Sequence, residues 1–528
     1  MQYEAGPPRG LWNVAAYILR VGRHRRRSNG SASTPQGGIY ALGPYALGRG
    51  RRDVTSAKVP PKPKSRPEAA PAGGREVPSA KVSRRGSGGH PRVDPARPPD
   101  PSVAVFRRER NPLKRALAVL GPGLVTGASD DDPSGVGTYA QAGASYGYAT
   151  LWTTLFMFPM MTSVQYISAK VGLVSGRGLA GVLREHYPRW VLYPALGALV
   201  IANTLNAGAD IGAIAAALNL LVPIRAIVFV VPVGLGIVAI QVFGSYQLIA
   251  RVFKWLALVL LAYLATALFT HPDLREVLAG TLVPTIRLDP QYIGMLVALL
   301  GTTISPYLFF WQASQEVDEQ IHMGRRLLWQ RRGANKKELR FALWDTIAGM
   351  AFSELVAYFI ILTTGATLFV AGKHDIGSAT DAADALRPLA GNFSAALLAI
   401  GLIGAGVLAV PVLTGSAAYG VAETFGWASS LDARPSRAPE FYAVIVAATA
   451  IGVAINFLSL NPITALVFSA VINGLLAAPL LVILMLVSNN RRAMGARTNG
   501  RILNAIGWVT AAVMGVAATA LVATTVLG

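Results

Sequence analysis

The chain has 528 residues, of which 52% are hydrophobic and only 14% are charged, and its mean hydropathy is +0.44. This composition excludes an ordinary soluble globular protein and indicates a membrane protein. Because the sequence contains no cysteine, disulfides, thiolate metal sites and thiol catalysis are excluded. Any metal ion must therefore bind through oxygen, nitrogen or thioether sulfur.

Residues 1–110 form a basic tail that is rich in Pro and Gly. The net charge of +21 is concentrated there, since residues 1–115 hold 24 of the 48 Lys and Arg residues but only 7 of the 27 Asp and Glu residues. The tail has too few apolar residues to offset the loss of chain entropy, so we expect a disordered cytoplasmic extension that contacts anionic membrane lipid. It lacks interleaved aromatic residues and a folded module, and no nucleic-acid partner is expected.

Residues 111–528 are expected to form the membrane domain, because they contain about eleven apolar runs of the length that crosses a bilayer as a helix. The predicted fold class is an all-α polytopic membrane protein. The segments 175–190, 322–340 and 488–501 are rich in Lys and Arg and fall on the same side as the tail. This pattern predicts a multi-pass plasma-membrane protein with a cytoplasmic N-terminus and an extracytoplasmic C-terminus. The expected spans are 116–147, 149–172, 189–221, 225–243, 246–270, 291–320, 340–371, 391–418, 437–458, 462–488 and 503–527.

The first span contains the acidic stretch "SDDDPSGV", residues 129–136. One aspartate at the centre of a membrane helix costs roughly 2.5–3.5 kcal/mol on insertion scales, so three in succession need a reason. Asp132 followed by Pro133 is typical of a helix start, with the aspartate as N-cap and the proline as first helical residue. A helix start in mid-membrane predicts a span broken into two half-helices with unwound backbone between them.

A second break is predicted in "LLGTTISPYLFFWQ", residues 299–312, where Ser305 is the expected cap and Pro306 follows Pro133 by 173 residues. The breaks fall in the first and sixth spans, which is the pattern of two five-helix repeats of opposite topology plus one extra helix. The repeats would cover about 113–270 and 290–488, with the extra helix at about 503–527. Paired broken spans indicate a mid-membrane substrate site of a secondary transporter.

The motifs resemble those of the natural resistance-associated macrophage protein (NRAMP) family of divalent metal transporters. The first helix of that family carries GPG, then Asp-Pro-Gly-Asn, then a QAGA-like stretch, and this chain has "GPGLVTGASDDDPSGVGTYAQAGASYGY" from Gly121 to Tyr148. Similar stretches, among them "GAIAAALNLL" and "GTTISP", extend the resemblance over essentially everything after residue 112. The resemblance implies a LeuT-type inverted-repeat fold, a divalent metal ion as substrate, no cofactor, and a transporter rather than an enzyme.

The same resemblance implies the metal site. Asp132 falls on the metal-binding aspartate of the family, whereas Gly135 and Ser305 replace a liganding asparagine and a liganding methionine. Loss of the thioether makes the site harder, which favours Mn²⁺ and Mg²⁺ over softer ions, with Fe²⁺ next. The expected site residues are Asp132, Asp131, Thr302 through its carbonyl, Ser305, Gly135 and Asn473.

Several further polar residues are expected to line the ion path. Tyr307 and Gln312 replace family histidines, and Asp210 remains from an acidic pair. Because few titratable groups are left, symport of protons with the metal ion is expected to be weak or absent. Asp130, together with Asp131, could hold a hydrated ion through water or could face an aqueous vestibule. The expected path residues are Asp210, Glu354, Tyr307, Gln312 and Asp130, whereas Asp345 is expected to be solvated or paired with arginine.

The sequence therefore predicts a secondary transporter that moves divalent metal ions into the cytoplasm by alternating access around Asp132. One alternative is a LeuT-type carrier of an amino acid or another organic substrate, because broken helices of this kind serve many substrates. A less favoured alternative is an intramembrane enzyme. No nucleophile and base arrangement, phosphate-binding glycine loop or HExxH pattern supports catalysis. A channel is the third option.

Overall fold

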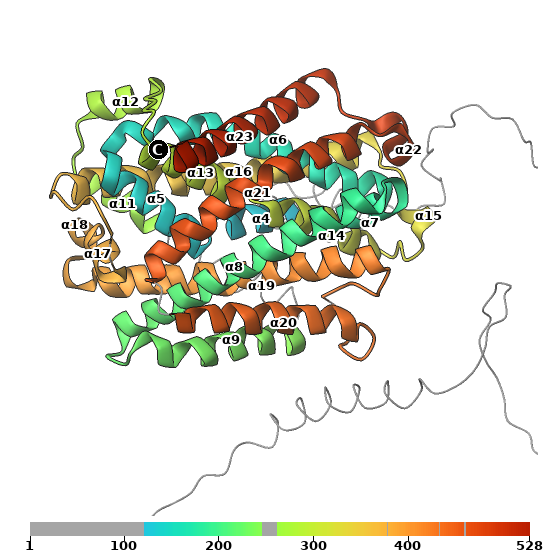
Figure 1. Ribbon diagram of the computed structural model, residues 1–528, viewed down its shortest axis with the longest axis horizontal. Helices are drawn as coiled ribbons and strands as arrows, with labels where there is room; N and C mark the ends of the chain where they lie inside the picture. The colour runs from blue at the N-terminus through green and yellow to red at the C-terminus, as the bar shows by residue number, and fades with distance from the viewer. Residues whose placement is uncertain (1–120, 245–260, 377, 432, 459–460, 528) are drawn as a thin grey trace, which may run out of the picture. The chain divides into compact units, whose positions relative to one another are not determined.

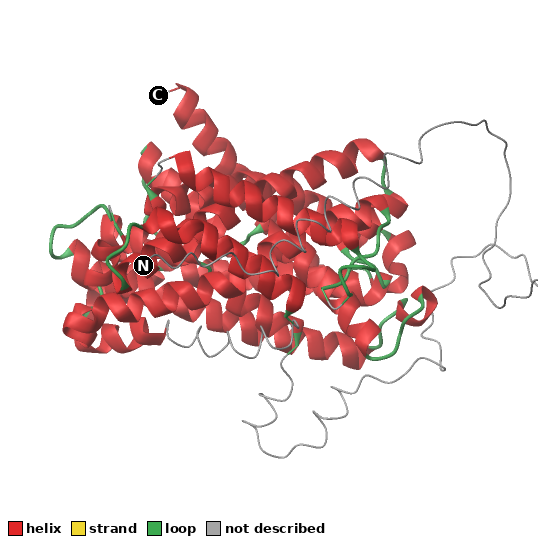
Figure 2. Ribbon diagram, turned by 90° about the horizontal axis from the view of Figure 1, so that it is seen from below, coloured by secondary structure: helices red, strands yellow, loops and turns green. Residues whose placement is uncertain are grey.

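A computed structural model describes residues 121–527, apart from 245–260, 377, 432 and 459–460. Every regular element in these residues is a helix (Figure 2), as the sequence predicted. The predicted tail, its boundary near residue 110 and the start of the first span lie outside the described residues. The elements of the first half are α4 (Pro122–Asp130), α5 (Pro133–Tyr146), η1 (Gly147–Thr150), α6 (Trp152–Ser175), α7 (Leu179–His186), α8 (Arg189–Leu221), α9 (Ala226–Phe243) and α11 (Ala262–Phe269).

The second half repeats the alternation of long and short helices. Its first broken span is α13 followed by α14, and its last helix is α23. The elements are α12 (Leu274–Leu282), α13 (Pro290–Thr303), α14 (Pro306–His322), α15 (Leu328–Arg331), α16 (Lys336–Thr364), η3 (Gly365–Phe369), α17 (Ala379–Asp384), α18 (Arg387–Ala390), η4 (Gly391–Phe393), α19 (Ser394–Phe425), α20 (Pro439–Ile455), η5 (Asn456–Leu458), α21 (Pro462–Asn489), α22 (Arg491–Met494), η6 (Gly495–Arg497) and α23 (Arg501–Leu527).

Eight helical segments of the described chain are long and apolar enough to cross a membrane. They correspond to eight of the predicted spans. The other three predicted spans differ in kind: 116–147 is divided into α4 and α5, 149–172 is the 24-residue helix α6, and 246–270 lies partly outside the described residues, with α11 at its end.

Both predicted breaks are present, and each is two residues long. The first separates α4 from α5 at Asp131 and Asp132, and the second separates α13 from α14 at Ile304 and Ser305. Each following helix begins with proline at its first position, where the missing N–H removes one unsatisfied donor and the fixed φ suits the helix. Local sequence therefore determines where these spans break.

Close backbone packing holds the broken helices in the middle of the helical domain. A Cβ added at Gly127 of α4 would lie 2.2 Å from the carbonyl oxygen of Gly349 on α16, and one at Gly301 of α13 would lie 2.2 Å from that of Ala470 on α21. Only glycine allows such close approach between helices in lipid. Figure 1 shows α8 and α19 side by side, with α9 and α20 beyond them. The half-helices are therefore enclosed by longer helices.

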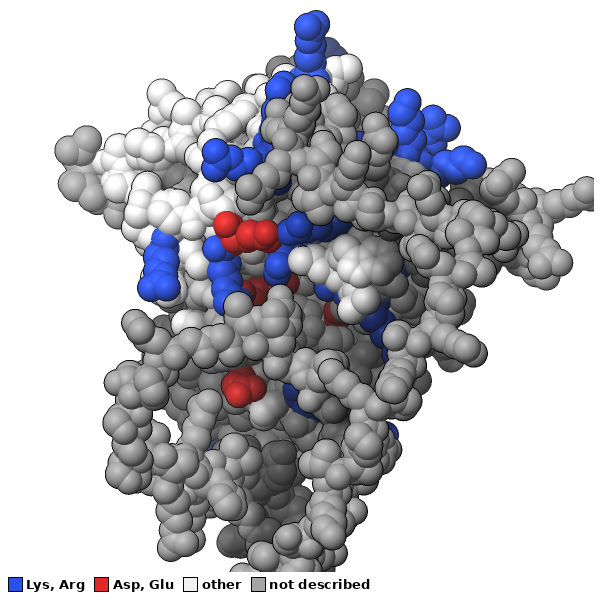
Figure 3. All heavy atoms as spheres, turned by 90° about the vertical axis from the view of Figure 1, so that its right-hand side faces the viewer, with Lys and Arg blue, Asp and Glu red and all other residues white. Residues whose placement is uncertain are grey.

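The arginine-rich segments lie together at one end of the helical domain, called the basic end below. This end carries α7, α15 and α22 (Figure 1), and Figure 3 shows Lys and Arg side chains gathered on it with a few acidic side chains between them. The segment 374–385, described apart from residue 377, contains α17; it is poorer in Lys and Arg and lies at the other end. The common location of the three predicted basic loops is therefore confirmed.

Candidate functional site

The first break fixes the carboxylate of Asp132 between two helices. Asp132 is the N-cap of α5, where its Oδ1 accepts a hydrogen bond of 2.6 Å from the backbone N–H of Gly135. Its Oδ2 accepts a bond of 2.9 Å from Nδ2 of Asn206 on α8. Asp132 is 1% exposed. A buried carboxylate is thus held at the helix start, where the helix dipole favours negative charge.

Asp210 adds a second carboxylate to the same helix start. Its Oδ1 accepts a hydrogen bond of 3.1 Å from the backbone N–H of Ser134, while its Oδ2 has no hydrogen-bond partner among the residues that the structure describes. Asp210 is fully buried on α8. The structure therefore brings the predicted residues Asp132 and Asp210 together around the first turn of α5.

The other two aspartates of the acidic stretch contact α16 instead. The hydroxyl of Ser353 lies 2.7 Å from Oδ2 of Asp130 and 3.2 Å from Oδ1 of Asp131. Glu354 is the next residue, is 6% exposed, and has no hydrogen-bond partner for either carboxylate oxygen within the described chain. Three buried acidic side chains are therefore associated with the end of α4 and with α16 around Ser353. Asp130 and Asp131 are fully buried, so in this structure neither faces an aqueous vestibule.

The second break has no carboxylate. Ser305 occupies the N-cap position of α14, but its hydroxyl donates backward to the carbonyl oxygens of Gly301 and Thr302 on α13, both at 2.7 Å. The prediction that Ser305 caps α14 is therefore correct for its position and wrong for its side chain. The carbonyl of Thr302, an expected metal ligand, accepts this hydroxyl in the structure.

Gly135 allows the two breaks to pack closely because it has no side chain. A Cβ at this position would lie 3.2 Å from the carbonyl oxygen of Asp130, 3.3 Å from Oγ1 of Thr302 and 3.3 Å from Cε2 of Tyr139. The first turn of α5 can therefore pack against both unwound segments. A larger residue there would force its neighbours to shift.

Tyr307 and Gln312 tie α14 to α4. The hydroxyl of Tyr307 donates to the carbonyl oxygen of Ser129 at 2.9 Å, and Oε1 of Gln312 accepts from the hydroxyl of Thr126. Nε2 of Gln312 donates to the carboxylate of Glu316 at 3.1 Å, one turn further along α14. Both predicted residues thus lie on the face of α14 that covers the first half-helix.

Asn473 is not joined to Asp132 by any hydrogen bond within the described chain. It is fully buried on α21, and neither atom of its amide group has a hydrogen-bond partner among the described residues. A buried amide without partners is costly, which makes this side chain a candidate for binding something that the structure does not contain.

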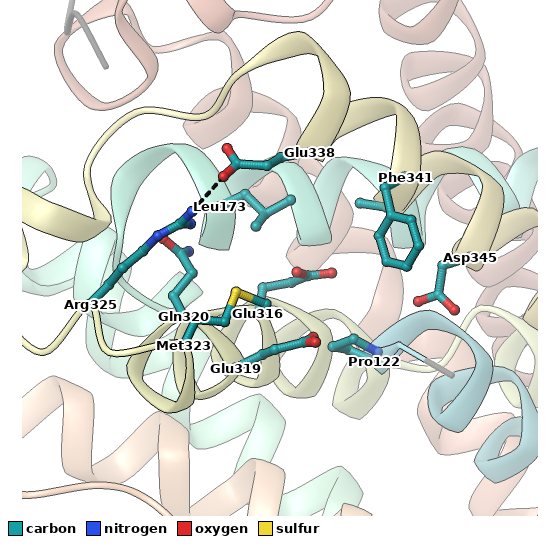
Figure 4. A pocket seen from close by; sticks show the side chains of 11 residues that line it. Pro122, Leu173, Glu316, Glu319, Gln320, Met323, Arg325, Glu338, Phe341 and Asp345 are labelled. Carbon is teal, nitrogen blue, oxygen red and sulfur yellow. Dashed lines mark hydrogen bonds and ion pairs between the residues drawn. The ribbon is translucent and has the colours of Figure 1, made fainter. Parts of the chain in front are cut away.

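A small open pocket lies at the basic end, beside Pro122 at the start of α4. Figure 4 shows Glu316 and Glu319 of α14 extending toward Pro122 of α4 and Asp345 of α16. The hydrogen bond from Gln312 to Glu316 links this pocket to the region of the first break. The pocket is therefore an acidic recess at the start of α4, at the opposite end of that half-helix from the first break.

The expectation that Asp345 is solvated or paired with arginine is wrong. Asp345 is 7% exposed, and its carboxylate accepts hydrogen bonds from the backbone N–H groups of Gly121 at 3.2 Å and Gly123 at 2.6 Å. The side chain satisfies the free donors at the start of α4, which local sequence leaves without a side-chain cap. Asp345 therefore anchors α4 to α16.

Three residues of this region were not singled out from the sequence. Asn206 contacts Asp132, Ser353 contacts Asp130 and Asp131, and Glu316 connects Gln312 to the pocket. Their signal was available, because polar side chains within apolar spans almost always face the interior of the helix bundle. Asn206 and Ser353 stand within four residues of Asp210 and Glu354, whose charge is the stronger signal.

The donor chemistry of the site limits how it could bind a metal ion. No three His, Asp or Glu side chains in the described part of the chain are close enough together to hold a metal ion by themselves. An ion at Asp132 would therefore need oxygen ligands from amide, hydroxyl or carbonyl groups and from water. Such ligands suit Mg²⁺, Ca²⁺ and Mn²⁺.

Comparison with known proteins agrees with this geometry. Residues 123–524 match the family described as natural resistance-associated macrophage protein-like. A divalent metal cation transporter, MntH of Klebsiella pneumoniae, is 27% identical over 407 residues, which cover 76% of this chain and 92% of that protein.

Solved structures share the fold. A manganese transporter of Eremococcus coleocola, crystallised with an aromatic bis-isothiourea compound, matches with a TM-score of 0.62 and 18% identity over 79% of this chain and 88% of that one. MhsT in complex with L-phenylalanine matches with a TM-score of 0.50 and 14% identity over 77% and 98% of the two chains. At these identities the similarity concerns the fold alone, and it confirms the predicted LeuT-type architecture.

The family match covers most of the chain and includes both broken spans and the helices that enclose them. The predicted resemblance is therefore confirmed, and with it the prediction of a transporter rather than an enzyme. The chain belongs to the NRAMP family of membrane transporters.

Proposed function

We propose that this protein is a secondary transporter that carries divalent metal ions across the plasma membrane into the cytoplasm, and that the ion binds at the first break on the carboxylate of Asp132. The observation that carries this proposal is a carboxylate with 1% exposure at the unwound centre of a membrane span. Burying an ionisable group at that depth costs free energy, so its presence there indicates a role in transport or binding. The names of the relatives, which include a divalent metal cation transporter and a manganese transporter, support the same substrate class.

The dipoles of the half-helices favour binding of a cation at the breaks. The C-terminal ends of α4 and α13 direct carbonyl groups toward the breaks, and the carboxylates of Asp132 and Asp210 balance the positive start of α5. Hydroxyl, carbonyl and amide oxygens then complete a hard ligand set, so we propose Mn²⁺ and Mg²⁺ as substrates, with Fe²⁺ next. The proposed ligands beside Asp132 are Asp131, Thr302, Ser305, the backbone of Gly135, and the unpartnered amide of Asn473.

The ion path is proposed to run along the acidic groups that contact α16 and then along α14. Asp130 and Glu354 would attract the cation toward the break, and Gln312 and Glu316 would lead it to the acidic pocket at the basic end. The concentration of Lys and Arg supports a cytoplasmic location for that end. Release there would complete uptake by alternating access.

Coupling to protons is proposed to be weak or absent. Tyr307 and Gln312 are neutral side chains that bind α4, so neither serves as a proton carrier between pH 5 and 8. Asp210 and Glu354 are the remaining candidate carriers near the path. If they suffice for coupling, metal uptake will acidify the vesicle interior in a fixed ratio.

The experiment that tests the proposal is uptake by the purified full chain in liposomes. Mg²⁺, Mn²⁺, Ca²⁺, Fe²⁺ and Cd²⁺ are supplied outside, and internal metal and internal pH are recorded together. We expect saturable entry of Mn²⁺ and Mg²⁺ with little acidification, and none in protein-free liposomes. Absence of uptake for every divalent ion, with transport of an amino acid instead, would overturn the proposal in favour of an organic-substrate carrier.

A further inference from the structure

Asn206 of α8 has an amide group in direct contact with the carboxylate of Asp132. The Nδ2 atom lies 2.9 Å from Oδ2 of Asp132, and the side chain is 1% exposed. The opposite atom of the amide, Oδ1, accepts a hydrogen bond of 3.0 Å from the hydroxyl of Ser469 on α21. The amide therefore bridges α5 and α21 and is the one side chain of the described residues that hydrogen-bonds to the Asp132 carboxylate.

We propose that Asn206 is a metal ligand that is uncovered by rotation of its amide: when the ion binds to Asp132, the side chain turns by half a rotation and directs Oδ1 at the ion. This inference rests on the proposed function and adds a specificity-determining residue to the site. In the structure the amide donates to the carboxylate and so occupies a position beside Oδ2 of Asp132.

The spacing fits octahedral coordination. Mg²⁺ binds oxygen at 2.0–2.1 Å, so two neighbouring ligands of an octahedron are separated by about 3 Å. The amide nitrogen and the carboxylate oxygen are already 2.9 Å apart. Because the two ends of a carboxamide have nearly the same size and shape, rotation places Oδ1 where Nδ2 now lies. No movement of α8 is required.

The neighbouring hydrogen bonds allow the rotation. At present the hydroxyl of Ser469 donates to Asn206, and the hydroxyl of Ser134 contacts the carbonyl oxygen of Leu466 at 3.2 Å. After rotation, Nδ2 of Asn206 would donate to Ser469, whose hydroxyl would turn to the same carbonyl oxygen at 2.8 Å. A hydroxyl can accept and donate at once, so the amide keeps a partner in both orientations. Either orientation of the amide is therefore compatible with the hydroxyl of Ser469.

The first turn of α5 itself supplies no comparable side-chain ligand. Ser134 directs its hydroxyl to Leu466 and Ser469, and Gly135 has no side chain. A carboxamide oxygen is a hard ligand that suits Mg²⁺ and Mn²⁺ better than soft ions. Asn206 would thus contribute to both affinity and selectivity.

The test is calorimetric titration of the purified full chain with Mn²⁺ and with Mg²⁺. We expect Asn206→Leu to weaken Mn²⁺ binding at least tenfold. We expect Asn206→Asp, which can ligate but cannot donate, to retain wild-type affinity or exceed it. Asn203→Leu is the matched control, because Asn203 is a buried asparagine on the same helix that bonds the carbonyl oxygen of Leu413 instead. Its affinity should remain within twofold to threefold of wild type.

The outcomes separate a ligand from a residue that only orients Asp132. Equal loss of affinity in Asn206→Leu and Asn206→Asp would mean that donation is essential, and would overturn the proposal. Unchanged affinity in Asn206→Leu would overturn it as well. If the leucine variant does not fold, Asn206→Ala replaces it, and a larger Mn²⁺-induced rise in Tm for Asn206→Asp than for wild type is the second readout. Failure of the proposed function itself is distinct, because Asp132→Asn would then bind Mn²⁺ as well as wild type.

Discussion

The two breaks have nearly the same backbone and opposite side-chain chemistry. The residue after the first half-helix is Asp131, with φ −81° and ψ 51°, and its counterpart at the second break is Ile304, with φ −109° and ψ 55°. The N-cap residue that follows is extended in both breaks. The first break then carries two carboxylates, Asp131 and Asp132, directly after Asp130 at the end of α4, whereas Ser305 at the second bonds back to its own half-helix. An inverted repeat thus provides two equivalent openings in the backbone, and the side chains place the charge in only one of them.

The polar side chains of the enclosing helices also differ between the two breaks. Asn206 of α8 bonds to Asp132 and Ser353 of α16 bonds to Asp130 and Asp131, while Asp210 of α8 accepts from Ser134 in the first turn of α5. The acidic groups of the first break therefore contact two neighbouring helices. The second break contributes hydroxyl and carbonyl groups without charge. We infer that the first break determines whether a cation binds, and that the second break adjusts which cation is preferred. The four predictions below test that division of roles.

The largest effect is expected for Asp132→Asn, which should abolish transport. Asparagine caps a helix about as well as aspartate, so α5 should keep its start while the site loses its charge. Uptake of Mn²⁺ into proteoliposomes measures the loss, and thermal unfolding shows that the protein remains folded. Asp289→Asn is the matched control, because Asp289 caps α13 before Pro290 in the same way but is exposed. Uptake at the wild-type rate in Asp132→Asn would exclude Asp132 as the principal ligand.

A smaller loss is expected for Ser353→Ala. Removing the hydroxyl leaves Asp130 and Asp131 without their common donor, and a hydrogen bond to a charged group contributes about 1.5–3 kcal/mol. We expect roughly a tenfold fall in the Mn²⁺ uptake rate, corresponding to about 1.4 kcal/mol. Thr346→Val is the control, since Thr346 is fully buried on the same helix and its hydroxyl has no hydrogen-bond partner in the described structure. If both variants behave alike, the acidic groups beside α16 have no part in transport.

Ser305→Met tests the second break. A thioether favours soft ions, so affinity for Cd²⁺ relative to Mg²⁺ should rise by up to about tenfold, provided that the longer side chain fits. Ser305→Ala serves as the comparison, because it frees the carbonyl groups of Gly301 and Thr302 without adding sulfur. Competition assays in folded protein that give the same ion preference for both variants would show that residue 305 does not face the ion.

The smallest effect on transport chemistry is expected for Asp345→Ala. The change removes the acceptor for the N–H groups of Gly121 and Gly123, far from Asp132 along α4. Leaving buried donors unsatisfied should lower stability by about 1–3 kcal/mol while Mn²⁺ affinity stays at its wild-type value. Thermal unfolding and calorimetry measure the two quantities. A large loss of Mn²⁺ affinity without loss of stability would contradict this prediction and would mean that Asp345 takes part in metal binding.

The sequence predicted the breaks well because their signals are local. Asp132 with Pro133 and Ser305 with Pro306 specify helix starts through capping and a fixed φ, which need no tertiary information. The contact of Asp345 with Gly123 spans 222 residues of sequence, and the side-chain orientation of Ser305 depends on the last turn of α13. Neither follows from residue type and spacing. The same limit explains why the sequence did not indicate that Asp130 and Asp131 contact Ser353 of α16.

The most direct test of the account is the structure of the full chain with Mn²⁺ bound, located by anomalous scattering. The account predicts a Mn²⁺ peak about 2 Å from a carboxylate oxygen of Asp132, between the two breaks. A peak in the basic-end pocket beside Glu316 and Glu319, with none at Asp132 in folded and transport-competent protein, would contradict it.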